Sequence, residues 1–391
     1  MARKPQQDEK MELLNDDQVW EITHETLSEY VSLDVQGDVY TTDDLFDVLL
    51  KAASGATTIE RACDDLGDIG SGNGIRYHLR NLEVEKVEEE INAALVAHLP
   101  KGVLKRPRNI AVDIVLVPYY GTVDEEESDF LIRSQARAGT THFFGYATLY
   151  LLHKNERYTL TMRCVRNSES LLETLCWLLD RFEALGGLIK RLYLDAGFYQ
   201  VRICRYLIEE RDIPFLMPAP KKGRRGGIRK LCNGPRTYRT DYTMQSPKDG
   251  RLTVPVILVK KYNKGKYGRH GVRWFAYVAY RWNRSLMVVY EDYRRRFGIE
   301  SSYALLHAVR ARIRSRKPSL RCLVVGLALL LVNVWVYLKW SAISLKRRGG
   351  RQVLERLFPF KRMCFLLQMA LLRRHGANTS IQVSKFIITG F

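Results

Sequence analysis

One apolar run near the middle of the chain limits the fold more than any other feature. Residues 110–117 (Ile-Ala-Val-Asp-Ile-Val-Leu-Val) are apolar at both alternating sets of positions, with one charge at Asp113. Successive side chains of a strand point to opposite faces, so this pattern predicts a strand buried on both sides. Such a strand needs covering layers on both faces of its sheet, which favours an α/β fold. The charge within it is costly unless something compensates it.

A second carboxylate, Asp195, ends another apolar run, residues 192–194. It is followed by Ala-Gly, which favours a turn, and then by a helical pattern that continues to residues 206–210. We therefore expect this side chain at the carboxyl end of a strand. The ordinary alternatives for both aspartates are a cap, a turn or a salt bridge with a neighbouring arginine.

A third carboxylate, Glu300, falls in a segment with helical spacing, residues 293–314, after a β-like stretch at residues 274–290. Tyr293, Arg296 and Glu300 are separated by steps of three and four, which place them on one helix face. A cation one turn from the carboxylate favours its ionised form. The string alone is a weak signal in a chain rich in Tyr and Arg, and the order and spacing of the three acids strengthen it.

The segment between the two aspartates predicts strands and one helix. Residues 142–152 and 157–165 have strand-like patterns, and residues 170–185 are amphipathic with Ser170 as an N-cap. A strand, hairpin, helix and strand in this order predict a mixed sheet flanked by helices.

The three acid-bearing segments resemble a known family. AVDIVLVPYYG, LYLDAGFY and YRRRFGIESSYALLH resemble the Asp-Asp-Glu transposases of insertion sequences, in the insertion-sequence-four-like superfamily, whose glutamate helix carries Y-x2-R-x3-E-x6-K. The resemblance covers roughly residues 105–345, and the segments IERACDDL and IRYHLRNL extend it weakly towards an archaeal branch. It implies an RNase H-like core in which the first two acids lie on adjacent strands and the third on a helix beside them.

The chemistry that the resemblance implies is cutting and joining of DNA. Asp113, Asp195 and Glu300 would be the catalytic residues and the ligands of two Mg²⁺ ions, with Mn²⁺ as a substitute. Two such ions, about 3.5 to 4 Å apart, stabilise the attacking and leaving oxygens of a phosphodiester. The implied reactions are hydrolysis at transposon ends and transfer of the freed 3′-hydroxyl into target DNA. The implied partners are double-stranded DNA, as inverted repeats and target, and a second copy of the chain in a homodimer.

One position departs from the family pattern. Where the family has its lysine, this chain has His307, which near neutral pH is a weaker fixed charge than Lys. Arg310, one turn further, is a candidate substitute. Tyr293, Arg296, His307 and Arg310 are therefore expected to support the site or to contact DNA phosphates, although an ordinary helix-face position remains open for His307.

Charge is divided unevenly along the chain. Of 62 Lys and Arg and 43 Asp and Glu, residues 1–100 hold 8 and 22, so the remainder carries the whole excess of positive charge. The DNA-binding surface is therefore expected C-terminal to residue 100. The expected contacts are Lys221, Lys222, Arg224, Arg225, Arg229, Lys230, Lys264, Lys266, Arg269 and Trp282. The indole would stack on an unpaired base, with core packing as the alternative.

These patterns predict four domains. They are an N-terminal helical, helix-turn-helix-like domain (1–104), a catalytic core (105–221 with 291–345), a β-rich DNA-contacting insertion (222–290) and a C-terminal helical tail (346–391). Three short helices, at 42–51, 58–66 and 74–82, would make the first domain either a DNA reader or a dimerisation module. The apolar stretch 322–338 is expected to be a buried helix rather than a membrane span, because 17 residues is the lower limit for crossing a bilayer.

Two other function classes remain open. A metal-dependent nuclease without strand transfer would use the same acids and the same basic surface. A catalytically decayed DNA-binding protein would keep the surface alone, although three retained acids disfavour it. The scattered cysteines and the absence of an apolar signal core at the start of the chain favour a cytoplasmic location.

Overall fold

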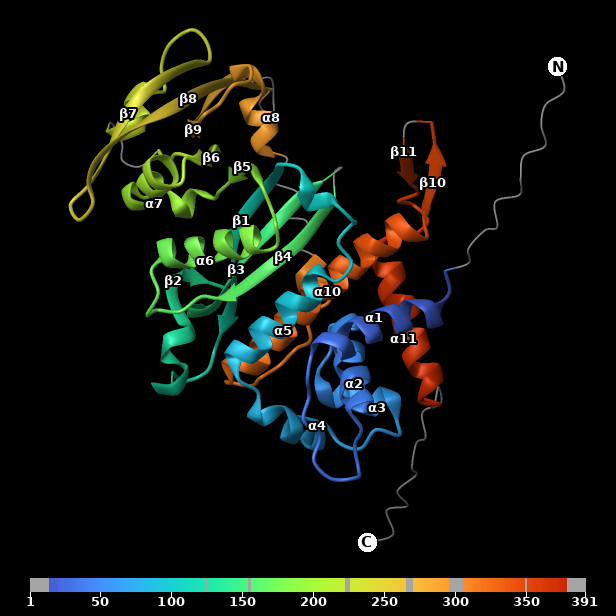
Figure 1. Cartoon of the computed structure of the whole chain (residues 1–391). Helices are drawn as coiled ribbons and strands as arrows, with labels where there is room; N and C mark the ends of the chain where they lie inside the picture. The colour runs from blue at the N-terminus through green and yellow to red at the C-terminus, as the bar shows by residue number, and fades with distance from the viewer. Residues whose placement is uncertain are drawn as a thin grey trace, which may run out of the picture. The chain divides into compact units, whose positions relative to one another are not determined.

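A computed structural model describes residues 14–123, 125–153, 156–221, 226–264, 270–294, 305–348 and 350–377. Two compact units make up the chain. The sheet unit is Leu95–Leu305, and the helical unit combines Met1–Ala94 with Leu306–Phe391. Figure 1 labels the helices and strands of both.

The sheet unit is built on one mixed sheet, to which nine of the described strands belong (Figure 1). The order is β2-β3-β1-β5-β6-β9-β8-β7, and β4 pairs with β3 outside this path. β1 is parallel to β5 and β5 to β6, whereas the other pairs are antiparallel. The strands are β1 (Arg108–Tyr119), β2 (Leu131–Arg137), β3 (Thr140–His153), β4 (Glu156–Cys164), β5 (Ile189–Tyr193), β6 (Phe215–Pro218), β7 (Tyr238–Ser246), β8 (Gly250–Lys264) and β9 (His270–Tyr280).

Helices flank this sheet, as the sequence predicted. α6 (Leu171–Ala184) packs against β3 and β4, and its first turn has the predicted cap: the Ser170 hydroxyl accepts the Glu173 N–H, and the Glu173 carboxylate accepts the Ser170 N–H. α7 (Val201–Arg205) continues into a π-helical turn at Tyr206–Glu210. α8 (Val289–Arg294) follows β9. The protein is therefore mixed α/β.

The predicted insertion, residues 222–290, is rich in strands but does not form a separate layer. β9 pairs with β6, from Phe215 opposite Tyr280 to Pro218 opposite Tyr277. β8 and β7 then add to β9 as antiparallel neighbours. The meander extends the central sheet, because β9 satisfies the free edge of β6.

The helical unit takes its elements from both ends of the chain. The three short helices predicted near the N-terminus are present as α2, α3 and α4. The elements are α1 (Asp16–Tyr30), α2 (Thr42–Ser54), α3 (Ile59–Leu66), α4 (Gly72–His78), most of α5 (Val84–Val96), α10 (Pro318–Ser341), the hairpin β10 (Ser344–Arg347) and β11 (Gly350–Val353), and α11 (Phe360–Arg374).

α10 is the apolar helix that the sequence singled out. Among the described residues it is the one helix long and apolar enough to cross a membrane, yet 89% of its apolar window is buried. By its contacts it groups with the helical unit, where it packs against α1, α2 and α11. A helix that is apolar on every side needs several helical neighbours, which the two chain ends supply.

Two predicted helices differ from the structure. Residues 309–314, expected to continue the helix from Tyr293, are not helical. The Arg312 N–H donates instead to the Thr57 carbonyl at 2.8 Å, and Pro318 disfavours helical backbone before it. The C-terminal tail, expected to be helical from residue 346, begins in the β10–β11 hairpin, and α11 starts only after Pro359.

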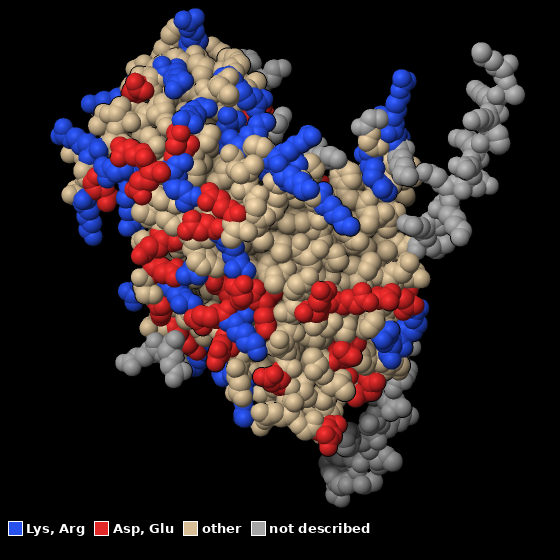
Figure 2. Space-filling view, viewed as in Figure 1, with Lys and Arg blue, Asp and Glu red and all other residues tan. Residues whose placement is uncertain are grey.

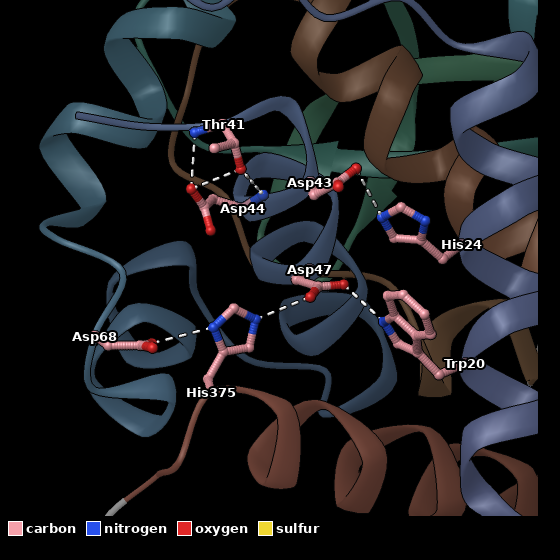
Figure 3. A network of polar contacts seen from close by, with 8 residues as sticks. All are labelled: Trp20, His24, Thr41, Asp43, Asp44, Asp47, Asp68 and His375. Carbon is pink, nitrogen blue, oxygen red and sulfur yellow. Dashed lines mark hydrogen bonds and ion pairs between the residues drawn. The ribbon is translucent and has the colours of Figure 1, made fainter. Parts of the chain in front are cut away.

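A buried polar network joins the two ends of the chain within the helical unit (Figure 3). Asp47 of α2 is 4% exposed and accepts hydrogen bonds from the Trp20 indole at 2.8 Å and from Nε2 of His375 at 2.9 Å. Nδ1 of the same imidazole lies 3.1 Å from Asp68. The hydrogen bond to Asp47 and the two nearby carboxylates raise the pKa of His375 above its ordinary value.

Candidate active site

Strand pairing places the first two predicted acids side by side. β1 and β5 are parallel, with Ala111 opposite Tyr193. Asp113 and Asp195 each lie two residues beyond that pair, and the backbone of Asp195 is still extended (φ −79°, ψ 164°). A step of two residues returns to the same face of a strand, and neighbouring strands lie about 4.8 Å apart. The two carboxylates therefore share one level and one face of the sheet.

Both aspartates are half-buried. The Ile114 N–H donates to Oδ1 of Asp113 at 2.9 Å, and the hydroxyl of Thr148, on the neighbouring β3, donates to the Asp113 carbonyl at 3.4 Å. Asp195 directly precedes a 3₁₀ turn at Ala196–Phe198, but its side chain makes no capping bond to that turn. Turn capping, one of the ordinary explanations for a strand-end aspartate, therefore does not account for Asp195.

α8 covers the same face of the sheet. Ala111 and Tyr193, which mark the face of the two acids, belong to one buried cluster with Val289 and Tyr293 of α8. The Tyr293 hydroxyl donates to the carbonyl of Leu194 at 3.2 Å, next to Asp195 in the chain. This bond fixes the end of α8 next to the second acid, which follows Leu194 in the chain.

A buried ion cluster that the sequence did not predict holds α8 in place. Asp292 is 2% exposed and accepts the Tyr193 hydroxyl at 2.7 Å. Its other partners are the Arg284 guanidinium and, at 3.6 Å, that of Arg191. Burial and the neighbouring Asp292 raise the pKa of Tyr193, so its hydroxyl stays a donor. The available signal was an arginine inside the strand 189–193 and an acid directly before Tyr293.

The carboxylates present fit hard divalent cations. Two aspartates level with each other on adjacent strands supply oxygen ligands, which Mg²⁺ prefers. Within the described ranges, no group of three or more His, Cys, Asp or Glu side chains is close enough to hold a metal ion. The third predicted ligand, Glu300, lies outside the described residues, as does Arg296.

The two other predicted phosphate contacts belong to the helical unit. His307 is exposed and Arg310 half-buried. Partial desolvation and the Arg310 cation lower the pKa of His307. The imidazole is therefore uncharged near neutral pH, in contrast to the lysine of the family pattern.

The predicted DNA contacts have different surroundings. Arg229 and Lys230 are exposed on a 3₁₀ turn, Gly227–Leu231, and Arg229 donates to the Lys221 carbonyl at 2.9 Å. The Lys221 ammonium is half-buried and donates to the Trp274 carbonyl. Lys264 is the last residue of β8. Lys222, Arg224, Arg225, Lys266 and Arg269 lie outside the described residues.

The expected stacking of Trp282 on a DNA base is not supported. Its side chain is 5% exposed, its indole N–H donates to the Ser285 carbonyl at 3.3 Å, and the Arg191 guanidinium lies 4.5 Å from the ring centre. The ring is enclosed in the same cluster as Tyr293. Trp282 is a core residue, which was the alternative interpretation of the sequence.

Charge on the sheet unit is segregated. On the face shown in Figure 2, Lys and Arg gather over the end that carries β7–β9, and acidic side chains gather where Figure 1 places α6 and α7. The Lys and Arg side chains over the β7–β9 end would attract a polyanion that approaches this face.

Comparison with known proteins gives a fold relative. The chain resembles piggyBac transposase, as solved by cryo-electron microscopy in a synaptic complex with hairpin DNA, with a TM-score of 0.54. The match covers 94% of this chain and 80% of that chain at 10% sequence identity, so it shows a shared fold. No protein-family model matches the chain, and no curated protein matches it in sequence.

Proposed function

We propose that this protein is a DNA transposase of the Asp-Asp-Glu type. The observation that carries the proposal is the common level of Asp113 and Asp195 on adjacent parallel strands, on the face that α8 covers. The fold relative is itself a transposase, which supports the same class. The sequence resemblance adds Glu300, seven residues after Tyr293, as the third acid.

The catalytic core that we propose is RNase H-like. Strand β3 pairs antiparallel with both β4 and β1, and β1, β5 and β6 follow as parallel neighbours. This arrangement puts the first and second acids on the neighbouring strands that the resemblance implies. The finer assignment, to the insertion-sequence-four-like superfamily, rests on the Tyr293, Arg296 and Glu300 spacing.

The proposed chemistry is two phosphoryl transfers at one site. In the first, water attacks a phosphorus atom at the transposon end, and the bond to the 3′ oxygen breaks to give a 3′-hydroxyl and a 5′-phosphate. In the second, that hydroxyl attacks a target phosphorus, forms a new 3′-O–P bond and releases a target 3′-hydroxyl. Bound Mg²⁺ would activate the attacking oxygen and stabilise the leaving oxygen. Asp113 and Asp195 would hold it, and Tyr293 would position the Asp195 strand end.

DNA cleavage tests the proposal. The substrate is the DNA that flanks the gene on each side, incubated with the full chain and Mg²⁺. We expect strand cleavage that Asp113→Asn and Asp195→Asn each abolish, with DNA binding largely kept because Lys and Arg contacts dominate affinity. Asp241→Asn, an exposed aspartate on β7, is the matched control and should cut normally. Cleavage that survives Asp113→Asn would refute the assignment.

The same experiment separates the two other candidates. With precleaved ends and a target plasmid, a transposase gives joined products, whereas a nuclease lacking strand transfer gives nicks or breaks alone. A decayed protein would bind DNA and cut under no condition. Light scattering of the DNA-bound protein would test the proposed homodimer.

A further inference from the structure

A cavity of about 610 Å³ lies in the helical unit, which contains neither Asp113 nor Asp195. Its walls are the first turn of α3, one residue of α4, one residue of α10 and the irregular residues 312–315. Small-molecule sites in proteins have volumes of about 300 to 1,000 Å³. The cavity is therefore large enough for a ligand the size of a nucleotide, and the chemistry proposed above does not use it.

A basic segment, residues 310–317, contributes one wall of the cavity and is fixed in place by hydrogen bonds. It carries five Lys and Arg and no acid, and it is neither helix nor strand. The Arg312 N–H donates to the carbonyl of Thr57, just before α3, at 2.8 Å. Nε of Arg321, in α10, donates to the Ser315 carbonyl at 2.7 Å. The segment is thereby tied to two neighbouring walls, so the cavity is preformed.

Two guanidinium groups at this wall lack a counter-ion among the described residues. Arg312 and Arg314 line the cavity with exposed side chains, and neither forms an ion pair with a carboxylate that the structure places. Arg76 of α4 also lines the cavity, but it forms an ion pair with Glu60 of α3. The lining therefore carries an uncompensated positive charge. Arginine binds phosphate oxygens through paired N–H donors, so this charge fits a phosphate group.

The rest of the lining suits the other parts of such a ligand. Ile59, Ile313 and Leu320 supply apolar surface. The Glu60 side chain is 51% exposed, and its carboxylate only accepts hydrogen bonds. It repels anions and accepts bonds from hydroxyl or amino groups, which the sugar and base of a nucleotide offer. A ligand that fits therefore combines a phosphate with an apolar part that bears donors, and a nucleotide has both.

We propose that this cavity binds a free nucleotide, with the phosphate at Arg312 and Arg314 and the base against the two isoleucines and Leu320. Binding has a conformational consequence. Residues 309–314 have the pattern of a helix that continues from Glu300, yet they are not helical. The ligand contacts them only in the conformation that forms the wall, so it stabilises that conformation over the helix. The proposed function does not require this site, and the site does not require the proposed function.

Isothermal titration calorimetry of the full chain in EDTA, with ATP, inorganic phosphate and adenosine, tests the site. ATP should bind, phosphate should bind more weakly because it makes no apolar contact, and adenosine should not bind detectably. Arg312→Ala and Arg314→Ala should each weaken ATP binding about tenfold, since each removes a hydrogen bond between charged groups. Arg362→Ala, which removes an exposed arginine of α11 in the same unit, is the matched control and should leave the affinity unchanged.

Hydrogen exchange gives a second measurement. With ATP, peptides that cover residues 309–315 should exchange more slowly, because the ligand stabilises the wall. Arg312→Ala should reduce that change at an ATP concentration that does not saturate the site, and Arg362→Ala should not.

A DNA duplex is the other source of phosphate groups, and a competition titration separates the two. A short duplex should not displace ATP. Displacement that depends on Arg312 and Arg314 would show that the basic segment contacts a DNA backbone and would overturn the inference. So would the absence of ATP binding, or an equal loss of affinity in Arg362→Ala. None of these measurements involves strand cleavage, so failure of the proposed function would leave them unaffected.

Discussion

The sheet unit and the helical unit each contain a buried aspartate that holds a helix in place, Asp292 and Asp47, and the charges of these two aspartates are compensated differently. In the sheet unit, Asp292 is 2% exposed and pairs with two arginines, which stay charged at every accessible pH. In the helical unit, Asp47 is 4% exposed and its cationic partner is His375, whose charge changes near neutral pH. The cations that hold the helix beside the candidate active site therefore keep their charge near neutral pH, whereas the cation that holds the C-terminal helix of the helical unit does not.

The two anchors also join different stretches of chain. Asp292 immediately precedes Tyr293, so its arginines fix the α8 face against the strand end of Asp195. His375 binds a carboxylate 328 residues earlier in the sequence and thereby holds the C-terminal helix to the N-terminal ones (Figure 3). The Asp292 cluster positions α8 beside the second candidate catalytic aspartate, and the Asp47–His375 pair holds the two chain ends in one unit.

The largest predicted effect follows from removing the sheet-unit anchor charge. Asp292→Asn leaves Arg191, itself 6% exposed, buried without its counter-charge. Breaking one side of a buried ion pair costs about 3 to 5 kcal/mol, and we expect that loss in the free energy of unfolding. Hydrogen exchange should rise in peptides from β5 and α8 and stay unchanged in α11.

The control for that substitution is the neighbouring Glu291→Gln. Glu291 is exposed and pairs with Lys261 at 3.3 Å on the surface, so its loss should cost less than about 1 kcal/mol. Equal destabilisation by the two substitutions would mean that the buried cluster does not anchor α8.

A smaller effect is expected in the helical unit. Asp47→Ala removes the acceptor of both the Trp20 indole and His375, which costs about 1 to 3 kcal/mol for the groups left without a partner. Exchange should then rise in α1, α2 and α11. Asp43→Ala, whose side chain is 74% exposed and lies 3.4 Å from His24, is the control and should change stability by less than about 1 kcal/mol. A loss confined to β5 and α8 would contradict the separate anchoring of the units.

We expect the stability of the helical unit, and not that of the β5 and α8 region, to change with pH near neutrality. Because the folded-state pKa of His375 is raised, protonation stabilises the folded form. That contribution is complete below the unfolded pKa of about 6.5 and is lost as pH rises through the raised folded value. Protection of α11 in hydrogen exchange, corrected for the intrinsic rate, should fall over this range, and His375→Gln should abolish the change. The same pH dependence in β5 and α8 would contradict the comparison.

Much of the fold was readable from the sequence because local patterns were strong. The apolar runs around Asp113 and before Asp195 predicted β1 and the end of β5, and the Ser170 cap predicted the start of α6. Which elements pack against one another could not be predicted from the sequence. The apolar α10 gave no directional signal about which unit would cover it. Residues 309–314 have a helical pattern but are not helical, and the Arg312 N–H donates to the Thr57 carbonyl instead.

Some residues of the candidate site could be predicted from the sequence, and others could not. Two acids after apolar strands carry their own signal, since a charge in a buried strand is costly. Arg191 and Asp292 carry only a weak signal, an arginine inside a strand and an acid directly before Tyr293, and Trp282 carries none. Whether such side chains are buried depends on a partner far away in the sequence. Trp282 was therefore expected to stack on a DNA base, but its ring is buried and lies against the Arg191 guanidinium.

The smallest predicted effect concerns a second histidine of the helical unit, whose pKa shifts the opposite way. Desolvation and Arg310 lower the pKa of His307, so it carries no charge near pH 7. We expect His307→Ala to leave DNA affinity unchanged there. His307→Lys should add one phosphate contact and steepen the plot of log affinity against log salt by about 0.9. In the unmodified protein, that extra steepness should develop only as pH falls below 6.5 through the lowered pKa, because the imidazole becomes a cation there. A weaker affinity in His307→Ala near pH 7, measured by anisotropy across a salt series, would show that the neutral ring itself contacts DNA.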